Sequence, residues 1–227
     1  TVTEVDEDEI TVLADETQTD DYIKLSGSDP LELIREAGIV GLGGAGFPTW
    51  FKLKDPFETE GIVLINAAEC EPILGHNIAA IEKAPEKVIR GLQIVMDIVH
   101  ASQGVIAIKE VHTRAVRRLR ETLDDERIRI ALLPDMYPMG EERAVIREVT
   151  GTLLGVDTLP VDADAIVVNA ETACRIQEAV DLKKPLIDKD MTVAGKLKGN
   201  ENLIRIFENI PIGISVGDVF EMAGGLA

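Results

Sequence analysis

A glycine-rich loop near residue 45 has the composition of an anion-binding segment. It runs Gly-Leu-Gly-Gly-Ala-Gly over residues 41–46. Glycines let the backbone approach a ligand closely and turn several N–H groups toward one anion, and a helix beginning at Pro48 would add its dipole to such a site. A helix, not a strand, is expected before the loop, so it lacks the context of a dinucleotide-binding fingerprint. On spacing alone, an anion-binding loop and a flexible connector both remain open.

A lysine and three aromatic residues accompany this loop. Lys52 lies six residues after the last glycine, where its ammonium can neutralise a phosphate, and a surface lysine is the ordinary alternative. Phe47, Trp50 and Phe51 stand within five residues in a chain with 4% aromatic residues. This concentration suits stacking on a planar ring, and it equally suits packing of the small helix expected after the loop.

Polar residues follow three apolar segments that we expect to be strands. The first segment is followed by Asn66, Glu69 and Glu71, the third by Tyr137, Gly140, Glu141 and Glu142, and the fourth by Asn169 and Thr172. In open α/β sheets, ligands bind beyond the carboxyl ends of the strands. One such residue alone is ordinarily a turn or a helix cap, but three polar strand ends on one edge favour a binding site. No acid–base pair stands out, and we assign no catalytic residue.

Hydrophobic periodicity predicts the elements that position these residues. The expected strands cover 62–65, 105–108, 128–133 and 165–168, and the expected helices cover 86–100, 113–123, 141–150 and 171–180. Strands that alternate with amphipathic helices indicate an α/β fold whose parallel sheet carries helices on both faces. Before them, a helix over 30–37 is expected to be capped by Asp29 and stopped by Gly38.

The segments that flank this region have a different pattern, and we predict three parts. Residues 1–28 are expected to hold a short β-hairpin over 1–14 and a polar linker. Residues 29–190 are expected to form the α/β domain. Residues 191–227, with shorter β-like stretches and several glycines, are expected to begin a small α+β unit.

Composition restricts the class of protein. The chain has 227 residues, 45% hydrophobic and 28% charged, as in ordinary globular proteins. The longest apolar run is too short for a membrane span and the N-terminus does not resemble a signal peptide, so a cytoplasmic location is expected. The formal charge is -18, and residues 1–21 hold nine acids without Lys or Arg. Because nucleic-acid binding needs a surplus of Lys and Arg, we expect no nucleic-acid partner.

The cysteines and histidines do not predict a metal site. Cys70 and Cys174 are far apart, with no Cys-x-x-Cys pair. An iron–sulfur cluster ordinarily takes four thiolates, and structural zinc takes four Cys or His ligands, so we expect neither in this chain. Cys174 is predicted to be a buried, reduced thiol. The three histidines, His76, His100 and His112, show no partner pattern and receive no role.

Four ordered motifs, at residues 41–49, 66–72, 137–142 and 169–172, resemble one family. They are similar to the FMN domain of the Rnf complex C subunit, which also occurs in the 51-kDa flavoprotein subunit of respiratory complex I. The resemblance covers roughly residues 30–227. Ile73 and the Gly-His-Asn at 75–77 depart from the Rnf pattern. They favour soluble relatives, namely the electron-transfer protein of proline reductase systems and the cobalamin reductase of propanediol utilisation.

The resemblance implies roles for the motif residues. FMN and the approaching NADH would face Lys52 and the loop residues Gly41, Gly43, Gly44, Ala45, Gly46 and Phe47. The flavin would be lined by Asn66, Glu69 and Glu71, the nucleotide side closed by Tyr137, Gly140, Glu141 and Glu142, and the ribityl phosphate held by Asn169 and Thr172. Residues 1–14 would resemble the edge of a barrel-sandwich segment, and residues 191–227 the opening of an SLBB domain.

The function that this resemblance implies is electron transfer. We expect an FMN module that accepts hydride from NADH and passes electrons to an iron–sulfur or protein acceptor outside this chain. Partners would be electron-transfer subunits or a reductase, in the cytoplasm or at the cytoplasmic face of a membrane complex. A flavin reservoir and a docking module without flavin are the alternatives. Because the family's Cys-rich domain is absent, a fragment or shortened member is expected. Replacing Gly44 by Val should abolish flavin binding at little cost in stability.

Overall fold

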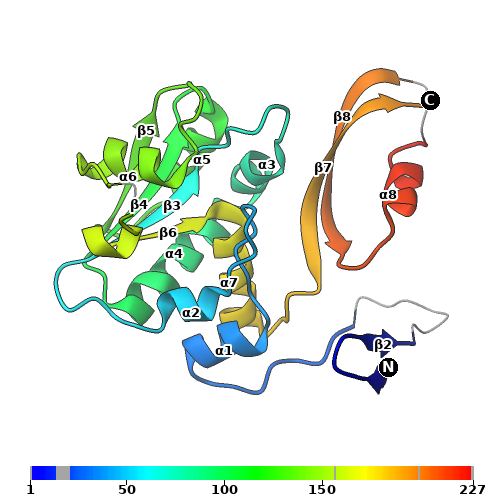
Figure 1. Cartoon of the computed structure of the whole chain (residues 1–227). Helices are drawn as coiled ribbons and strands as arrows, with labels where there is room; N and C mark the ends of the chain where they lie inside the picture. The colour runs from blue at the N-terminus through cyan, green and yellow to red at the C-terminus, as the bar shows by residue number, and fades with distance from the viewer. Residues whose placement is uncertain (1, 14–20, 156, 199, 226–227) are drawn as a thin grey trace.

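The computed structural model describes residues 2–13, 21–155, 157–198 and 200–225 (Figure 1). The strands are β1 (Val2–Val5), β2 (Ile10–Val12), β3 (Ile62–Ala67), β4 (Gln103–Lys109), β5 (Ile128–Leu133), β6 (Ala165–Asn169), β7 (Asp188–Leu197) and β8 (Asn200–Pro211). The helices are α1 (Pro30–Glu36), α2 (Thr49–Leu53), α3 (His76–Lys83), α4 (Pro85–Val99), α5 (Thr113–Thr122), α6 (Glu142–Thr150), α7 (Ala170–Leu182) and α8 (Val216–Met222), with a 3-10 turn η1 (Pro160–Ala163).

Four strands form a parallel sheet in the order β5-β4-β3-β6. The chain moves outward from β3 through β4 to β5 and then returns to the opposite side of β3 with β6. In open α/β sheets, such a reversal of strand order creates a crevice beyond the carboxyl ends of the two strands that flank it. Here Asn66 of β3 is in register with Asn169 of β6. The two asparagines singled out from the sequence therefore stand side by side at the switch point.

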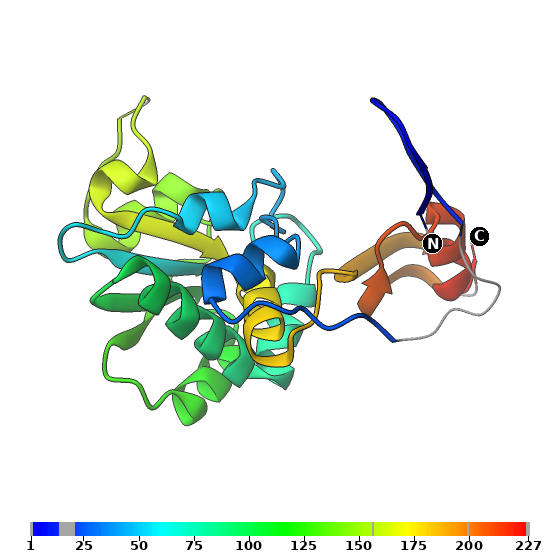
Figure 2. The same ribbon diagram turned by 90° about the horizontal axis from the view of Figure 1, so that it is seen from below.

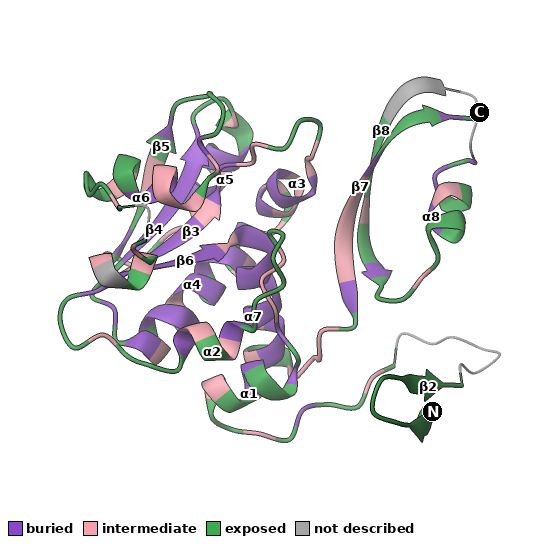
Figure 3. Ribbon diagram, in the orientation of Figure 1, coloured by how far each residue is buried: buried purple, intermediate pink, exposed green. Residues whose placement is uncertain are grey.

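Both faces of the sheet are covered, but unequally. Side chains alternate along each strand, so Val63 and Ile65 of β3 join the core formed with α1, α2, α4, α5 and α7. Leu64, on the opposite face, joins a smaller core formed with α6. Figure 3 shows the buried residues concentrated in the sheet, α4 and α7. The predicted α/β fold with helices on both faces is confirmed.

Local sequence signals explain several element ends. The Asp29 side chain accepts a hydrogen bond of 3.0 Å from Glu32 N, and Pro30 occupies the first position of α1. Gly38 follows α1 with φ of +71°, which favours glycine. The predicted cap of this helix is confirmed. None of the described helices combines the length and the apolar character needed to cross a membrane.

A hairpin and a helix follow the α/β region. β7 and β8 pair antiparallel, and α8 packs on them through the small core of Val193, Leu197, Ile210, Val219 and Ala223. The hairpin lies beside α3, and the hairpin and α8 project from one side of the α/β region (Figures 1 and 2). β7 begins at Asp188, so the boundary predicted at 191 falls inside this strand. Resemblance of this part to an SLBB domain stays a prediction.

The structure differs from the sequence prediction in two places. A helix, α3, lies between β3 and α4 where none was expected, because its eight residues span only about two turns and give little periodicity. The expected linker contacts the α/β region within its described residues: Leu25 is buried in the main core, and its N–H donates a hydrogen bond to Lys183 O. Residues 14–20 of that linker lie outside the described residues. The expected N-terminal hairpin is confirmed as the β1–β2 pair.

Candidate functional site

The glycine-rich loop packs against the N-terminus of α7. Leu42 N donates a hydrogen bond of 2.9 Å to Thr172 Oγ1. A Cβ atom on Gly43 would stand 3.3 Å from the Asn169 side chain, so the backbone approaches the end of β6 closely. These contacts join segments far apart in sequence and hold the loop in place, which a flexible connector would not require.

The tip of this loop has unused hydrogen-bond donors. Within the described residues, the N–H groups of Gly43, Gly44 and Ala45 donate no hydrogen bond, and all three residues are exposed. Gly44 has φ of +146° and Gly46 has φ of +65°, values that L side chains rarely adopt. The expectation that Gly44→Val costs little stability is therefore wrong, because valine would be strained at this φ.

Lys52 of α2 is fixed in place and is not a free surface lysine. Its Nζ donates to Val167 O at 2.7 Å and lies 3.0 Å from Glu142 Oε1. The side chain is one-third exposed. The ammonium thus connects α2 to β6 and to the first turn of α6, at the same edge of the sheet as the loop.

The end of β3 is bound to the loop between β5 and α6. Asn66 Nδ2 donates a hydrogen bond of 2.8 Å to Gly140 O, and Asn66 Oδ1 accepts one of 3.1 Å from Ala68 N. A Cβ on Gly140 would lie 2.1 Å from Ala68 O, a distance that no side chain can occupy. Glycine at 140 is required because the two backbones nearly touch.

Glu69 is held by a residue that the sequence analysis missed. Asn77 Nδ2 donates a hydrogen bond of 3.0 Å to Glu69 Oε2, and Glu71 N donates one of 3.3 Å to Oε1. Asn77 is 7% exposed and lies in the first turn of α3. No sequence pattern indicates this contact. We call residues 66–77 the Glu69 wall and residues 169–172 the α7 wall.

Several predicted site residues serve local structure as well. Glu141 caps α6 by accepting a hydrogen bond from Ala144 N at 3.0 Å, and Asn169 Oδ1 caps α7. Within the described residues, Asn169 Nδ2 donates no hydrogen bond, so it remains available to a ligand. Thr172 is 2% exposed and its hydroxyl oxygen is used by the loop. Tyr137 and Glu71 are exposed at the rim.

The sequence left two roles open for the three aromatic residues, packing of the small helix and stacking on a planar ligand, and the structure divides the residues between these roles. Trp50 packs against the main core, with the Arg35 guanidinium 5.0 Å from its ring centre. Phe47 and Phe51 are exposed and meet edge to face, with ring centroids 5.9 Å apart. Trp50 therefore contributes to packing, whereas the two phenylalanines are accessible to a planar ligand.

A buried charged cluster lies behind the α7 wall, on its β7 side. Arg175 of α7 forms ion pairs of 2.7–3.0 Å with Glu178, Asp188 and Asp190. Burial alone would raise the pKa of Glu178, but Lys87 and Arg175 bring it below its ordinary value. The neighbouring Cys174 is buried, which confirms the predicted buried thiol. This burial raises the pKa of the thiol to about 12.

His76 also contacts this region, although it was given no role from the sequence. The ring is 8% exposed, with Nδ1 3.0 Å from Thr192 Oγ1 and Nε2 3.8 Å from Glu171 Oε2. His76, which belongs to the Glu69 wall, thus contacts β7 through Thr192 and faces the α7 wall through Glu171. A single histidine carries no recognisable sequence signal for such a contact.

The geometry of the carboxyl edge fits a phosphate-bearing planar cofactor. The N–H groups of residues 43–45, which donate no hydrogen bond, stand next to the N-terminus of the thirteen-residue α7. The positive end of the helix dipole stabilises a phosphate at such a place. Phe47 and Phe51 are exposed beside the loop, and the polar ends of β3 and β6 stand side by side at the same edge of the sheet. The acids Glu69, Glu71 and Glu141 belong to other segments, away from the glycine-rich loop in sequence, and suit hydroxyl and amide groups of a ligand.

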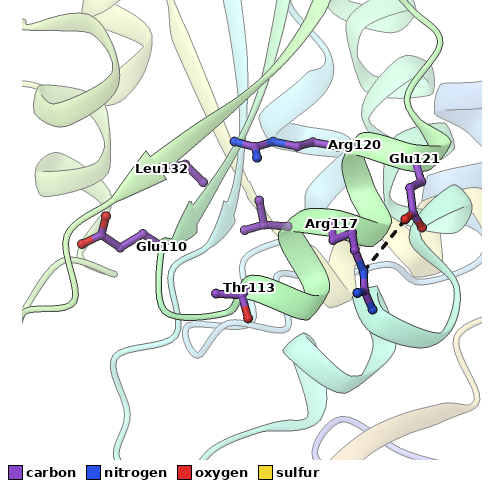
Figure 4. Close-up of a pocket in the computed structure, with 7 residues that line it drawn as sticks. Glu110, Thr113, Arg117, Arg120, Glu121 and Leu132 are labelled. Atoms are coloured by element: carbon purple, nitrogen blue, oxygen red, sulfur yellow. Dashed lines mark ion pairs between the residues drawn. The ribbon is translucent and has the colours of Figure 1, made fainter.

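A different groove lies along the edge strand β5 (Figure 4). It has a volume of about 480 Å³ and is lined by Glu110, Arg117, Arg120, Glu121 and Leu132, among others. Arg117 and Glu121 pair across one helical turn at 3.9 Å. Two arginines and two glutamates offset each other, and β5 is two strands away from β3. The residues that line the groove all lie outside the four motifs.

Comparisons with known proteins identify a family. Residues 34–178 match the family model described as the Nuo51 FMN-binding domain. The cobalamin reductase PduS of Salmonella typhimurium is 37% identical over 203 residues, which cover 89% of this chain and 43% of that protein. The C subunit of the proton-translocating ferredoxin:NAD(+) oxidoreductase complex of Clostridium ljungdahlii is 32% identical over 204 residues, covering 89% of this chain and 44% of the relative.

Solved structures show the same fold. An NAD+-reducing [NiFe]-hydrogenase in the air-oxidized state matches with a TM-score of 0.72 at 22% identity, covering 88% of this chain and 40% of that chain. The H2-reduced state of such an enzyme gives 0.71 at 22% identity, covering 87% and 39%. This chain spans less than half the length of the relatives that it matches.

Proposed function

This chain belongs to the Nuo51 FMN-binding domain family, and from that premise we propose that it is an FMN-binding electron-transfer module. In this proposal the module accepts hydride from NADH and passes electrons to an iron–sulfur or protein acceptor outside this chain. The observation that carries it is the convergence of all four motifs at the switch point between β3 and β6. Two hydrogen bonds join the motifs in pairs, Leu42 to Thr172 and Asn66 to Gly140, and the two pairs meet where Asn66 is in register with Asn169. Lys52, three residues after the first motif, adds contacts with Val167 O and Glu142.

The chain's own residues would bind and orient the cofactor. The N–H groups at 43–45 and the amide of Asn169 would hold the phosphate, and Thr172 would keep the loop in place. Asn66, Glu69 and Glu71 would face the ring system, while Tyr137, Gly140, Glu141 and Glu142 would border the nucleotide. When bound, FMN supplies the chemistry of hydride acceptance and single-electron release. This division of labour explains why no acid–base pair is needed.

Two other functions use the same fold. A flavin reservoir would take electrons from a protein partner and not from NADH, and a docking module would bind no flavin. The N–H groups at the tip of the loop that donate no hydrogen bond favour flavin binding over docking, because they are exposed and available to an anionic ligand. Electron-transfer subunits or a reductase would be the partners, in the cytoplasm or at the cytoplasmic face of a membrane complex.

Cofactor binding is tested directly with the purified chain. Visible absorption spectra and equilibrium dialysis with FMN and with FAD should show retention of FMN and weaker retention of FAD. Circular dichroism in the same samples establishes that the chain is folded. A folded chain that retains no FMN would overturn the proposal.

Hydride acceptance is tested by anaerobic stopped-flow mixing of NADH with the FMN-loaded chain. We expect bleaching of the flavin absorbance, and slow or absent reduction of a protein partner, because two lone cysteines cannot hold a cluster. Flavin that dithionite reduces but NADH does not would favour the reservoir. Fast turnover of a protein acceptor by this chain alone would contradict the expected division between hydride acceptance and onward transfer.

A further inference from the structure

One strand of the C-terminal hairpin contacts both walls of the candidate site. On the first side, Thr192 of β7 meets the start of α3. Thr192 Oγ1 accepts hydrogen bonds from Gly75 N at 3.2 Å and from His76 N at 3.3 Å, and it lies 3.0 Å from His76 Nδ1. Two accepted bonds and one donated bond use the full capacity of a hydroxyl group. Thr192 therefore does for α3 what a capping residue does, from another part of the chain.

The hydroxyl of Thr192 also fixes the imidazole. Because this oxygen already accepts from two backbone groups, its proton is directed to His76 Nδ1, which leaves the ring proton on Nε2. Nε2 faces Glu171 Oε2 at 3.8 Å. The ring thus stands between β7 and the α7 wall in one defined orientation.

The start of α3 in turn contacts Glu69, which is predicted to line the flavin. Asn77 follows His76 directly and donates from Nδ2 to Glu69 Oε2 at 3.0 Å. Asn77 is 7% exposed, and its Oδ1 has no hydrogen-bond partner among the described residues. A buried amide with one unused oxygen is costly. The contact with Glu69 is the one polar interaction of this side chain in the described residues, so its position depends on where α3 begins.

On the second side, β7 is bound to the α7 wall. The carboxylate of Glu171, whose side chain is 2% exposed, accepts from Lys189 Nζ at 2.6 Å and from Asp190 N at 2.8 Å. Glu171 stands between Asn169, which caps α7, and Thr172, which holds the glycine-rich loop. Residues 189–192 of β7 therefore contact both walls, in addition to the sheet pairing that places Asn66 beside Asn169.

We propose that Thr192 is a positioning residue for the flavin site. It sets the start of α3, and through Asn77 it sets where the Glu69 carboxylate stands, while Lys189 and Asp190 hold the opposite wall. The C-terminal hairpin is then part of the cofactor site although none of its residues belongs to the four motifs. This inference rests on the proposed FMN binding and on the predicted place of Glu69 beside the flavin.

The test measures FMN affinity in the full chain by fluorescence titration. Thr192→Val keeps the shape of the side chain and removes the oxygen, so FMN should bind about tenfold more weakly, as expected for lost hydrogen bonds to buried groups. Thr192→Ser restores the oxygen and should return affinity to within about twofold of wild type. The flavin midpoint potential should shift in Thr192→Val and return in Thr192→Ser, because Glu69 is a charge near the ring.

A matched control separates positioning from general loosening of the hairpin. Lys83, at the other end of α3, pairs with Glu208 of β8. Lys83→Met removes a hairpin contact of the same helix, but not the path to Glu69, and should leave FMN affinity within about twofold of wild type. Equal weakening by Lys83→Met and Thr192→Val would overturn the positioning role.

The path through Asn77 gives a second measurement. Asn77→Ala leaves the hairpin contacts in place and should weaken FMN binding by a similar factor; the double variant with Thr192→Val should lose less than the product of the two factors. If the loss of FMN affinity in the double variant equals the product of the two single losses, the two residues act independently and the path through Asn77 is contradicted. Wild-type affinity in both single variants would also contradict it. If the wild-type chain does not bind FMN, the proposed function itself is overturned. If the wild-type chain binds FMN and the Thr192 and Asn77 variants bind it equally well, only this inference is overturned.

Discussion

The carboxyl edge of the sheet and the groove beside β5 are both surface features with charged residues, but they are built differently. At the edge, three hydrogen bonds connect residues separated by 130, 115 and 74 positions in sequence. In the groove, the ion pair between Arg117 and Glu121 joins residues four positions apart on one helix. A groove between a helix and an edge strand arises in any such sheet, whereas side chains that bind the backbones of distant segments require a specific fold. The comparison teaches that a site is recognised by what its polar groups hold together, not by its volume.

The same contrast appears in the backbone. The edge contains glycines with φ that disfavours side chains or with backbone contacts that exclude them, at 44, 46 and 140. Glycine occupies such positions without strain, whereas a side chain placed there costs free energy. No residue in the groove has either property among the described residues. Substitutions at the edge should therefore be severe, and those in the groove mild.

The largest effect is expected from Gly140→Val. Its Cβ would lie 2.1 Å from Ala68 O, so the β5–α6 loop must move away from β3 and break the Asn66 contact. We expect a loss of about 3 kcal/mol in the free energy of unfolding, measured in urea, and no detectable FMN binding. Gly155→Ala is the control, because its Cβ would have its nearest neighbour at 3.5 Å. If Gly140→Val binds FMN with wild-type affinity, the carboxyl edge of the sheet is not the FMN site.

Gly44→Val should have the next largest effect. At φ of +146° a valine is strained by about 1–3 kcal/mol, and its side chain would stand in front of the free N–H groups, so FMN affinity should fall at least tenfold. Gly217→Ala, in α8 and with its nearest neighbour at 3.5 Å, is the control and is expected to bind FMN normally. If Gly44→Val loses stability but keeps its affinity in the fluorescence titration, the loop does not contact the cofactor.

The sequence predicts most of the α/β fold because its signals are local. The apolar run at 62–65 and its three counterparts predict the strands, and Asp29 with Pro30 predicts the start of α1. The motifs predict which segments meet at the edge. The strand order is not among the sequence predictions, so the register of Asn66 with Asn169 comes from the structure. Short elements with weak periodicity, such as α3, are not predicted in this way.

Contacts between distant side chains are the part that the sequence does not reveal. Thr192 and His76 lie 116 positions apart, and neither residue type implies the other. Asn77 supports Glu69 across eight positions without any motif. The φ of Gly44 depends on how the loop closes against α7, so its strain is not visible in the sequence. Tertiary packing decides these features, and local propensity does not encode it.

A smaller effect is expected from acid pH at the turn between α5 and β5. Hydrogen bonds from Arg127 lower the pKa of Asp125 from 3.8 to about 2. Because the folded pKa lies below the unfolded one, this stabilisation is present above about pH 4 and is lost as pH falls toward 2. Asp125→Asn should cost about 0.2–1 kcal/mol at pH 6, as for an exposed pair, and less at pH 3. Urea denaturation of both proteins at the two pH values measures the difference, and FMN affinity at pH 6 should not change. A difference that grows as the pH falls would contradict the lowered pKa.

The smallest effect is expected in the groove itself, and it gives the sharpest comparison with the edge. Arg117 and Arg120 line the groove (Figure 4), and Arg117 makes a long, exposed pair with Glu121. Replacing both arginines by Ala should change the free energy of unfolding by less than about 0.5 kcal/mol. Lys52→Met also removes cationic charge, but at the edge, where Nζ bonds to Val167 O and Glu142. We expect FMN to bind at least tenfold more weakly to Lys52→Met and within about twofold of wild type to the double arginine variant. If the double variant loses FMN and Lys52→Met keeps it, the flavin binds in the groove. The contacts between distant segments at the edge would then serve stability alone.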